Sequence, residues 1–180
     1  MKRLLIIAAA ATLCFAATES RVSRANIVAF ERTIQEKLSA PSTDPYDLLG
    51  DARGTYLEGY GVLFTTELDL INAGVLNMTP FKPTVSKEEI AATRERKLKK
   101  LLVLKDSMRS LMMNASGLLD GLAPTEQISM EVILFNYKWE DTQGIPHRVF
   151  MTAEKQKLQA ARMTHAGQPE LTAIIEEQLR

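Results

Sequence analysis

The stretch TYLEGYGVLFTTELDL, residues 55–70, decides the expected fold because it has the pattern of one long β-strand. From residue 60 onward every second position belongs to a largely apolar stripe: Tyr60, Val62, Phe64, Thr66, Leu68 and Leu70. The alternate positions begin with Gly59 and Gly61 and end with Glu67 and Asp69. Because glycine leaves room beside the backbone, we predict that the two glycines let a neighbouring segment approach closely or let the strand bend. A flat floor for a ligand is the functional alternative.

A long helix is expected after this strand, over residues 86–119. Its start carries a capping box, in which Ser86 is the N-cap and Glu89 reaches back to it. Apolar residues then recur at helical spacing: Ile90, Leu98, Leu101, Leu104, Met108, Met112 and Ala115. At 1.5 Å per residue the helix is roughly 45–50 Å long, which is enough to lie across a whole sheet.

Two further strands are expected as a hairpin over residues 128–152. The first, residues 128–139, is apolar on both faces in its middle, which favours a central strand covered on both sides. The second, residues 145–152, has Pro146 near its start. Because proline cannot donate to a ladder, it favours an edge strand or a strand end.

Shorter helices complete the expected domain and are predicted over residues 23–39, 153–163 and 169–179. All elements together indicate one α+β, two-layer domain over residues 18–180. Its sheet is expected to be small and mostly antiparallel, with three or four strands. The long helix and the shorter amphipathic helices are expected to cover one face of it. If the first two strands are neighbours, the long helix is a right-handed crossover between them.

Residues 1–17 have the layout of a secretory signal peptide, with a short basic start and then an apolar run of small and aliphatic residues. The run is shorter than the roughly 20 apolar residues of a membrane-spanning helix. We therefore expect a periplasmic or secreted protein, and an uncleaved anchor is the alternative. Cleavage removes Cys14, the single cysteine, so disulfides, thiolate catalysis and cysteine-ligated metals are excluded from the mature chain.

The charge balance gives no indication of a nucleic-acid partner. The chain has 22 basic and 22 acidic residues, and loss of Lys2 and Arg3 with the signal peptide leaves 22 − 2 = 20 basic residues against 22 acidic ones. Nucleic-acid binding usually requires a basic excess. No phosphate-binding glycine motif is present either, so no cofactor is expected.

One resemblance to known proteins rests on the segment Gly59-Tyr60-Gly61-Val62-Leu63-Phe64 and the acid-ended stretch that follows it. This segment resembles a strand in a group of exported bacterial proteins of unknown function. The order of parts is similar over residues 56–151: a G-Y-G-x-x-F strand, a long basic-then-apolar helix and a strand hairpin. The resemblance implies an exported protein, and it implies no activity or site.

The enzymatic hypothesis depends on Glu67 and Asp69. On one strand face their backbones are about 6.5–7 Å apart, and such a pair can perform general acid–base chemistry when burial raises one pKa. His147 is a further weak candidate if its strand lies beside them, and the result would be a carboxylate-dependent hydrolase. Acids on an exposed strand end are the structural alternative. The two histidines, His147 and His165, form no metal-binding motif, so no metal site is expected.

The basic run over residues 94–100 gives a second possible function. Arg94 and Lys97 lie near the apolar stripe of the long helix, so they could place their charges beside Glu67 and Asp69 in a structural role. The rival is a basic patch for anionic lipid head groups, which would make the protein a peripheral membrane protein.

Three aromatic residues, Phe135, Tyr137 and Trp139, alternate along the expected strand and form a ladder on one face. They are either part of the core or an exposed contact surface. We therefore expect a non-enzymatic domain that binds an envelope protein or peptide through the aromatic face or an open sheet edge.

Overall fold

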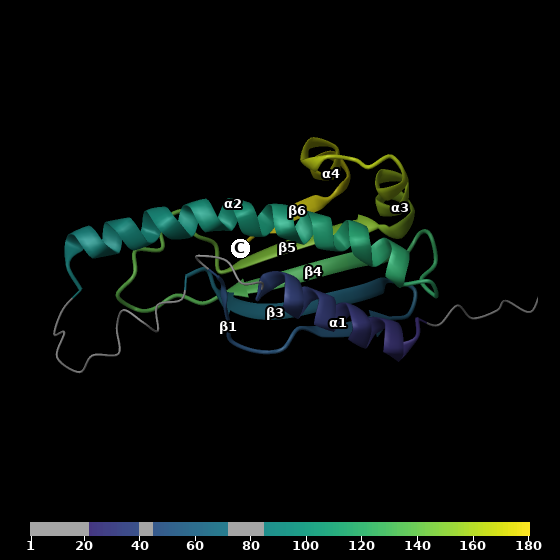
Figure 1. Cartoon of the computed structure of the whole chain (residues 1–180), viewed down its shortest axis with the longest axis horizontal. Helices are drawn as coiled ribbons and strands as arrows, with labels where there is room; N and C mark the ends of the chain where they lie inside the picture. Colours follow the sequence, from purple (N-terminus) through teal and green to yellow (C-terminus); the bar gives the residue numbers. More distant parts are fainter. Residues whose placement is uncertain (1–21, 40–44, 72–84) are drawn as a thin grey trace, which may run out of the picture.

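The computed structural model of the chain describes residues 22–39, 45–71 and 85–180 (Figure 1). Residues 1–17, for which a signal peptide is expected, lie outside this part. The elements in chain order are α1 (Arg24–Leu38), β1 (Asp47–Leu48), β2 (Arg53–Leu57), β3 (Gly61–Asp69), α2 (Lys87–Leu118), β4 (Gln127–Leu134), β5 (Arg148–Glu154), α3 (Lys155–Met163), α4 (Gln168–Ile174) and β6 (Glu176–Leu179).

The strands form one mixed sheet in the order β1-β3-β4-β5-β6, and β2 also pairs with β3. Only the β3–β4 pair is parallel among the pairs of the described sheet. The connection between these two strands contains α2, which lies along the sheet (Figure 1). The expected α+β architecture with one long helix is confirmed, and the sheet has six strands rather than three or four.

The opening stretch is a hairpin, so the prediction of a single strand over residues 55–70 is wrong. β2 ends at Leu57 and β3 begins at Gly61, and the backbone N–H of Tyr60 donates to the carbonyl of Leu57 at 3.0 Å to close the turn. Gly59 and Gly61 have φ values of +76° and +136°, which L-residues rarely adopt. The two glycines therefore let the chain reverse. The alternation of apolar residues continues through the turn, so the sequence pattern does not reveal where β2 ends and β3 begins.

Gly61 has a second role at the seam between β3 and β4. It is paired with Gln127, and a Cβ atom at position 61 would overlap the backbone of Gln127. The expectation that a glycine lets another backbone approach is confirmed here. Gly59 has open space around its Cα, so its role is limited to the turn.

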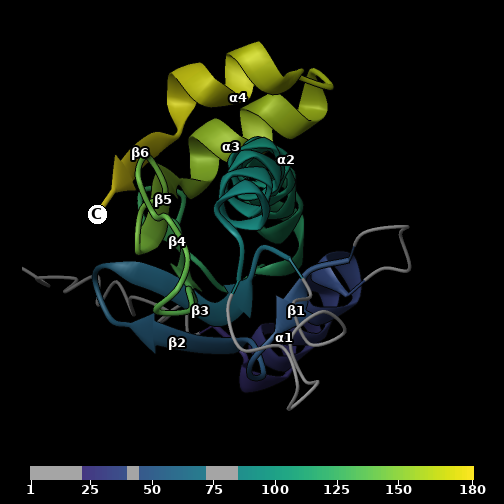
Figure 2. The ribbon, with the colours of Figure 1, turned by 90° about the vertical axis from the view of Figure 1, so that its left-hand side faces the viewer.

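The hydrophobic core lies between the helices and one face of the sheet. Seen along the axis of α2, the sheet curves around this helix (Figure 2). Phe30 of α1 packs edge-on against Phe64 of β3, with ring centroids 4.7 Å apart. The most buried core side chains of α2 and the sheet include Leu104, Met108, Met112, Val62, Leu68, Ile128, Val132, Val149 and Met151. No helix in the described part of the chain is long and apolar enough to span a bilayer.

Three other sequence expectations need correction. The strand expected over residues 128–139 ends at Leu134, and its second face is not covered, since Ile133 is exposed. The strand expected over residues 145–152 is β5, which begins only at Arg148. It lies between two other strands, so the edge-strand alternative for Pro146 is wrong, and Pro146 lies just before the start of the strand. The helix expected over residues 169–179 stops at Ile174, and the chain continues as β6. Pairing with β5 decides the conformation of β6, and local periodicity does not report such long-range pairing.

The two glycines of the hairpin are expected to tolerate alanine very differently. Gly59→Ala introduces only the cost of positive φ, about 1–2 kcal/mol. Gly61→Ala adds a clash with backbone that cannot move without breaking the β3–β4 seam, so we expect a loss above about 3 kcal/mol. Urea unfolding of both variants measures the difference. Equal losses would contradict the assignment of Gly61 to the seam.

Candidate functional site

A buried ion-pair cluster lies at the end of β3, below α2. The ammonium group of Lys97 on α2 is 2.9 Å from Oδ1 of Asp69 and also contacts Oε2 of Glu140. It donates further to the carbonyl of Phe135 at 3.2 Å and to Oδ1 of Asn136 at 3.0 Å. The three charged side chains are at most 2% exposed. We call Lys97, Asp69 and Glu140 the ion-pair cluster.

The position of Lys97 on α2 explains why the cluster forms. Lys97 shares a face of the helix with Leu101 and Leu104, which are core residues. A lysine on an apolar face has to carry its ammonium group to acceptors, because an unpaired buried charge is very costly. The prediction that Lys97 places its charge beside Asp69 is confirmed.

The cluster has two acidic groups and one basic group, and the pKa of Glu140 is shifted as a result. Burial raises the pKa of the Glu140 carboxyl above its ordinary value of 4.5, and the nearby Asp69 adds to the rise, while Lys97 opposes it. Oε1 of Glu140 is buried without a hydrogen-bond partner. Asp69 is better satisfied, since its Oδ1 also accepts from the backbone N–H of Ile71 at 3.2 Å. The buried carboxyl of Glu140 therefore takes up its proton at a higher pH than an exposed glutamate does.

The ion-pair cluster fastens the β4–β5 connection, residues 135–147, to α2. A second tie is made by Arg94, whose Nε donates to the carbonyl of Gln143 at 2.8 Å and whose guanidinium lies 3.6 Å from Asp141. The expectation that Arg94 lies beside Glu67 and Asp69 is therefore wrong. Arg94 is one turn before Lys97 on the helix, and it meets the connection instead of the strand end.

The three aromatic side chains lie on this connection. The rings of Phe135 and Tyr137 meet edge-on with centroids 4.9 Å apart, and those of Tyr137 and Trp139 stack at 6.1 Å with an angle of 16°. The expected ladder on a strand face is wrong, because β4 ends at Leu134. The rings still gather in one group, which we call the aromatic platform. Tyr137 is 38% exposed, and Phe135 and Trp139 are half-buried.

The acidic pair of the hydrolase hypothesis does not form an accessible site. Glu67 is exposed, whereas Asp69 is buried in the ion-pair cluster. His147 is exposed, and its carbonyl accepts from the backbone N–H of Leu134 at 2.8 Å. Within residues 22–39, 45–71 and 85–180 no group of three histidine, cysteine or acidic side chains could hold a metal ion.

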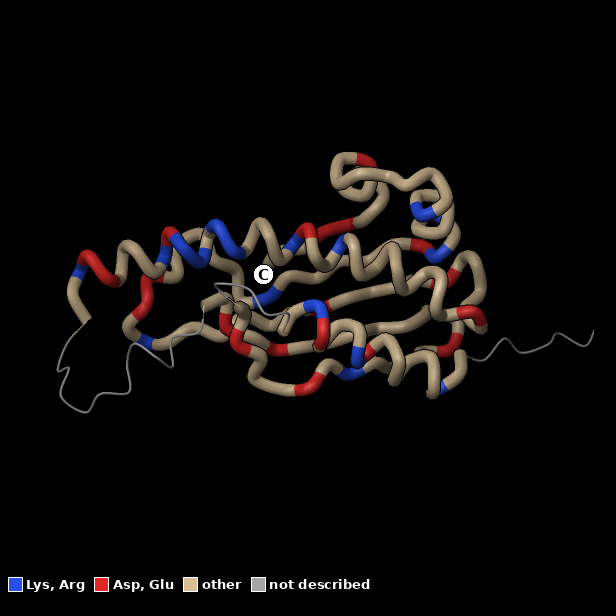
Figure 3. Tube along the Cα trace, in the orientation of Figure 1, with Lys and Arg blue, Asp and Glu red and all other residues tan. Residues whose placement is uncertain are grey.

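The basic residues of the run on α2 have partners within the protein. Figure 3 shows acidic residues interspersed with the basic ones along the N-terminal half of this helix. Lys99 pairs with Glu95 at 2.7 Å, and the ammonium of Lys100 lies over the Tyr46 ring at 4.8 Å from its centroid. Arg96 also has an interaction partner. Binding to a membrane surface requires basic side chains that are free to contact lipid head groups. The contacts of Lys99, Lys100 and Arg96 reduce the number of such side chains on α2.

Sequence reasoning missed a second buried lysine, Lys155, which is the first residue of α3 and contacts the turn after α2. Lys155 donates to the carbonyls of Leu119 and Leu122 at 2.9 and 2.7 Å, and to that of Asp120 at 3.4 Å. Burial lowers the pKa of its ammonium group, while Asp120 and Glu126 oppose the change. Lys155 thereby donates to three carbonyls of the turn that follows α2, and one of them, that of Leu119, also accepts from the backbone N–H of Leu122 at 3.1 Å. No local pattern around Lys155 could have revealed this.

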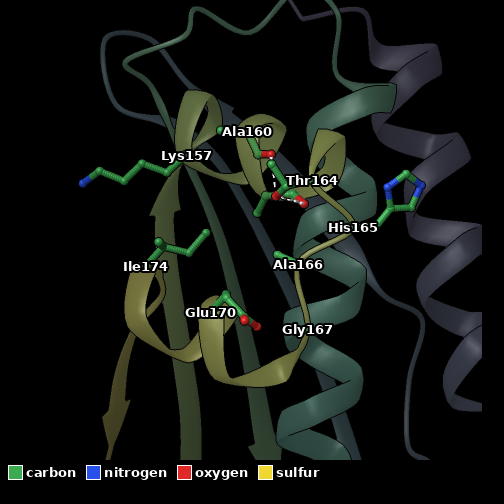
Figure 4. A pocket seen from close by; sticks show the side chains of 9 residues that line it. Lys157, Ala160, Thr164, His165, Ala166, Gly167, Glu170 and Ile174 are labelled. Carbon is green, nitrogen blue, oxygen red and sulfur yellow. Dashed lines mark hydrogen bonds between the residues drawn. The ribbon is translucent and has the colours of Figure 1, made fainter.

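A cavity of about 500 Å³ lies between α3 and α4 (Figure 4). Alanines and Ile174 supply much of its lining, and the side chains of Lys157 and His165 point away from its centre (Figure 4). His165 has a φ of +53° because it ends α3 in a left-handed turn, where the next backbone N–H, of Ala166, donates to the carbonyl of Ala161 at 2.9 Å. The strained residue is thus explained by helix termination. The cavity contains no facing pair of acid and base.

Comparison of the chain with protein-family models, curated proteins and solved structures finds no match. The sequence-predicted binding residues do come together, on the β4–β5 connection and the α2 face that holds it: Arg94, Lys97, Phe135, Tyr137 and Trp139.

Removal of the buried ammonium is expected to destabilise the fold strongly. Lys97→Met leaves Asp69 and Glu140 buried and unpaired, which costs about 3–5 kcal/mol. The matched control Lys99→Met removes an exposed pair that solvent screens, so it should leave the free energy of unfolding nearly unchanged. Urea unfolding at pH 7 measures both. Similar losses in the two variants would show that the ion-pair cluster does not hold the fold together.

Glu140→Gln is expected to alter the pH dependence of stability. The folded-state pKa of Glu140 lies above 4.5, so the folded chain binds more protons than the unfolded chain between these two values. The stability contribution of Glu140 is therefore fully present below pH 4.5 and is lost as the pH rises through the folded pKa. We expect the unfolding free energy of the variant minus that of wild type to increase over this interval. Urea unfolding between pH 4 and pH 8 tests this, and a difference that shrinks with pH would contradict it.

Proposed function

We propose that the protein is a non-enzymatic binding domain of the bacterial envelope, and that its contact surface is the aromatic platform. The observation that carries the proposal is the stacking of Tyr137 and Trp139 on a connection held by buried bonds to Lys97. Tyrosine and tryptophan are common at the energetic centres of protein interfaces. Side chains that are already ordered lose little conformational entropy when a partner binds.

The chemistry of the platform favours a protein partner with an apolar segment. Tyr137 offers an exposed ring that is flanked by two other aromatic side chains. Lys138, next to it in the chain, is exposed and adds a positive charge at the rim. An apolar segment with an acidic residue beside it would complement this surface.

An envelope location is supported by the sequence. Residues 1–17 have the layout of an export signal, and residues 18–180 contain no cysteine that an oxidising compartment could alter. A platform that acts after export would meet envelope proteins or peptides.

Tyr137→Ala is expected to abolish capture of the partner. Immobilised wild-type protein is incubated with an envelope extract, and the bound proteins are identified by mass spectrometry. Loss of a central aromatic contact costs about 2 kcal/mol or more, so recovery should fall by at least about tenfold. Met163→Ala is the matched control, because Met163 is 83% exposed on α3, away from the β4–β5 connection.

The captured protein is then purified and titrated against the wild-type chain. Trp139 is the single tryptophan, so its fluorescence reports on the platform directly. We expect an emission change that saturates with the partner. Equal recovery of the partner by Tyr137→Ala and Met163→Ala, or an unchanged emission, would show that the aromatic platform is not the contact surface.

A further inference from the structure

The outer edge of β6 presents unpaired backbone groups. Arg148 of β5 and Arg180 exchange two backbone hydrogen bonds, at 2.9 and 3.2 Å. In an antiparallel pair the direction of these groups alternates along the strand, so Gln178 also points its N–H and C=O toward β5. The backbone groups of Glu177 and Leu179 therefore point away from the sheet. In the described part of the chain they have no partner.

At the opposite edge of the sheet, outward-pointing backbone groups are bound by side chains of α1. On β2, the N–H of Gly54 donates to Glu31 of α1 at 2.7 Å, and the carbonyl of Gly54 accepts from Arg24 of α1 at 3.0 Å. Arg24 and Glu31 also pair with each other at 3.2 Å. Side chains of α1 thus block this edge against another strand, which is a common protection. β6 lacks such a cover in the described chain.

The side chains of β6 are arranged so that the strand can complement itself. Glu176 and Gln178 of β6, and Arg180 directly after it, share the face of the sheet that carries Phe150. Among the described residues neither Glu176 nor Arg180 has an ion-pair partner. The guanidinium of Arg180 donates to the side chain of the nearby Gln178, at 3.2 Å.

We propose that β6 pairs in antiparallel fashion with β6 of a second copy of the chain, around a two-fold axis at Gln178. In this register Glu177 lies opposite Leu179 of the second copy, and their outward groups form the bonds that both lack. Glu176 lies opposite Arg180 of the second copy, and the symmetry makes this ion pair twice. A shift of the register by one residue would lose the match of backbone groups and of charges.

The charge environment of Arg180 fits this arrangement. A shallow hollow of about 220 Å³ is lined by Arg148, Arg180, Glu131 and others. Glu131 pairs with Arg148 at 3.1 Å, which leaves the second guanidinium of the hollow without a carboxylate. Glu176 of the second copy supplies it in the proposed register.

The helix side of the seam offers apolar contacts. Glu177 is tied to α2 through Lys105 and Arg109, at 2.5 and 2.7 Å. Leu179 projects on this same side and is 49% exposed. Leu102 lies one turn before Lys105 on α2 and is 62% exposed. Leucines from both copies would therefore flank the paired strands and extend the small contact of the strands themselves.

A cysteine placed at the two-fold axis tests the register. Opposite residues in a non-hydrogen-bonded antiparallel pair have Cα atoms about 4.5 Å apart, which lies within the range of a disulfide. Gln178→Cys, produced from the full sequence with Cys14→Ser, is therefore expected to give a disulfide-linked dimer on mild oxidation. Glu176→Cys is the matched control and should not link to itself. A mixture of Glu176→Cys and Arg180→Cys should form the mixed dimer. Equal linkage of Gln178→Cys and Glu176→Cys would overturn the register.

Sedimentation equilibrium tests the association without a covalent link. Leu179→Pro removes an N–H that points outward, so it leaves the bonds to β5 intact and should yield a monomer, whereas Leu179→Ala should still dimerise. Arg180→Glu should raise the dissociation constant by at least about tenfold, and the charge-swapped pair Glu176→Arg with Arg180→Glu should restore it. A monomeric wild-type chain at high concentration would overturn the proposal. The aromatic platform is not involved in this interface, so its tests stand independently.

Discussion

The burial of the Lys97 ammonium group is the constraint on which the rest of this end of the molecule depends. Removing a charge of this size from water costs several kcal/mol, so it has to be met by acceptors with good geometry. These acceptors come from the end of β3 and from the β4–β5 connection. The connection therefore folds against α2, and Tyr137 and Trp139 take a fixed position because their neighbours do. Lys155 is a second buried lysine that needs acceptors, and it donates to three carbonyls in the turn after α2.

Much of the fold could be predicted because its signals are local. The capping box at Ser86 is present with both of its hydrogen bonds, and α2 follows from it. The contact between Lys97 and Asp69 could be predicted because a lysine near an apolar stripe can extend its stem along that surface and place its charge beside an acid at a strand end. The turn at Gly59 was hidden by an apolar stripe that continues past it. β6 was hidden because its helical spacing is overridden by pairing with β5.

The sequence could predict which residues belong to the candidate site, but not the conformation of the segment that carries them. The three aromatic residues were found from their alternation, which an extended connection shares with a strand. Nothing in the sequence shows that β4 stops at Leu134 and that the chain then turns toward α2. Glu140 was missed because it reads as one acid among several in a loop, and its raised pKa arises from burial by distant segments. Lys155 was missed for the same reason.

The parallel seam between β3 and β4 has a consequence for how the chain folds. The β2–β3 and β4–β5 pairs join segments that are close in sequence, so both can form early. The seam joins strands separated by the whole of α2, and closing such a long loop is slow. Until it closes, both hairpins have an exposed edge at the place where Gly61 later meets Gln127. The newly made polypeptide is thus most exposed to wrong intermolecular pairing just before this last step, which is the stage at which a chaperone would protect it.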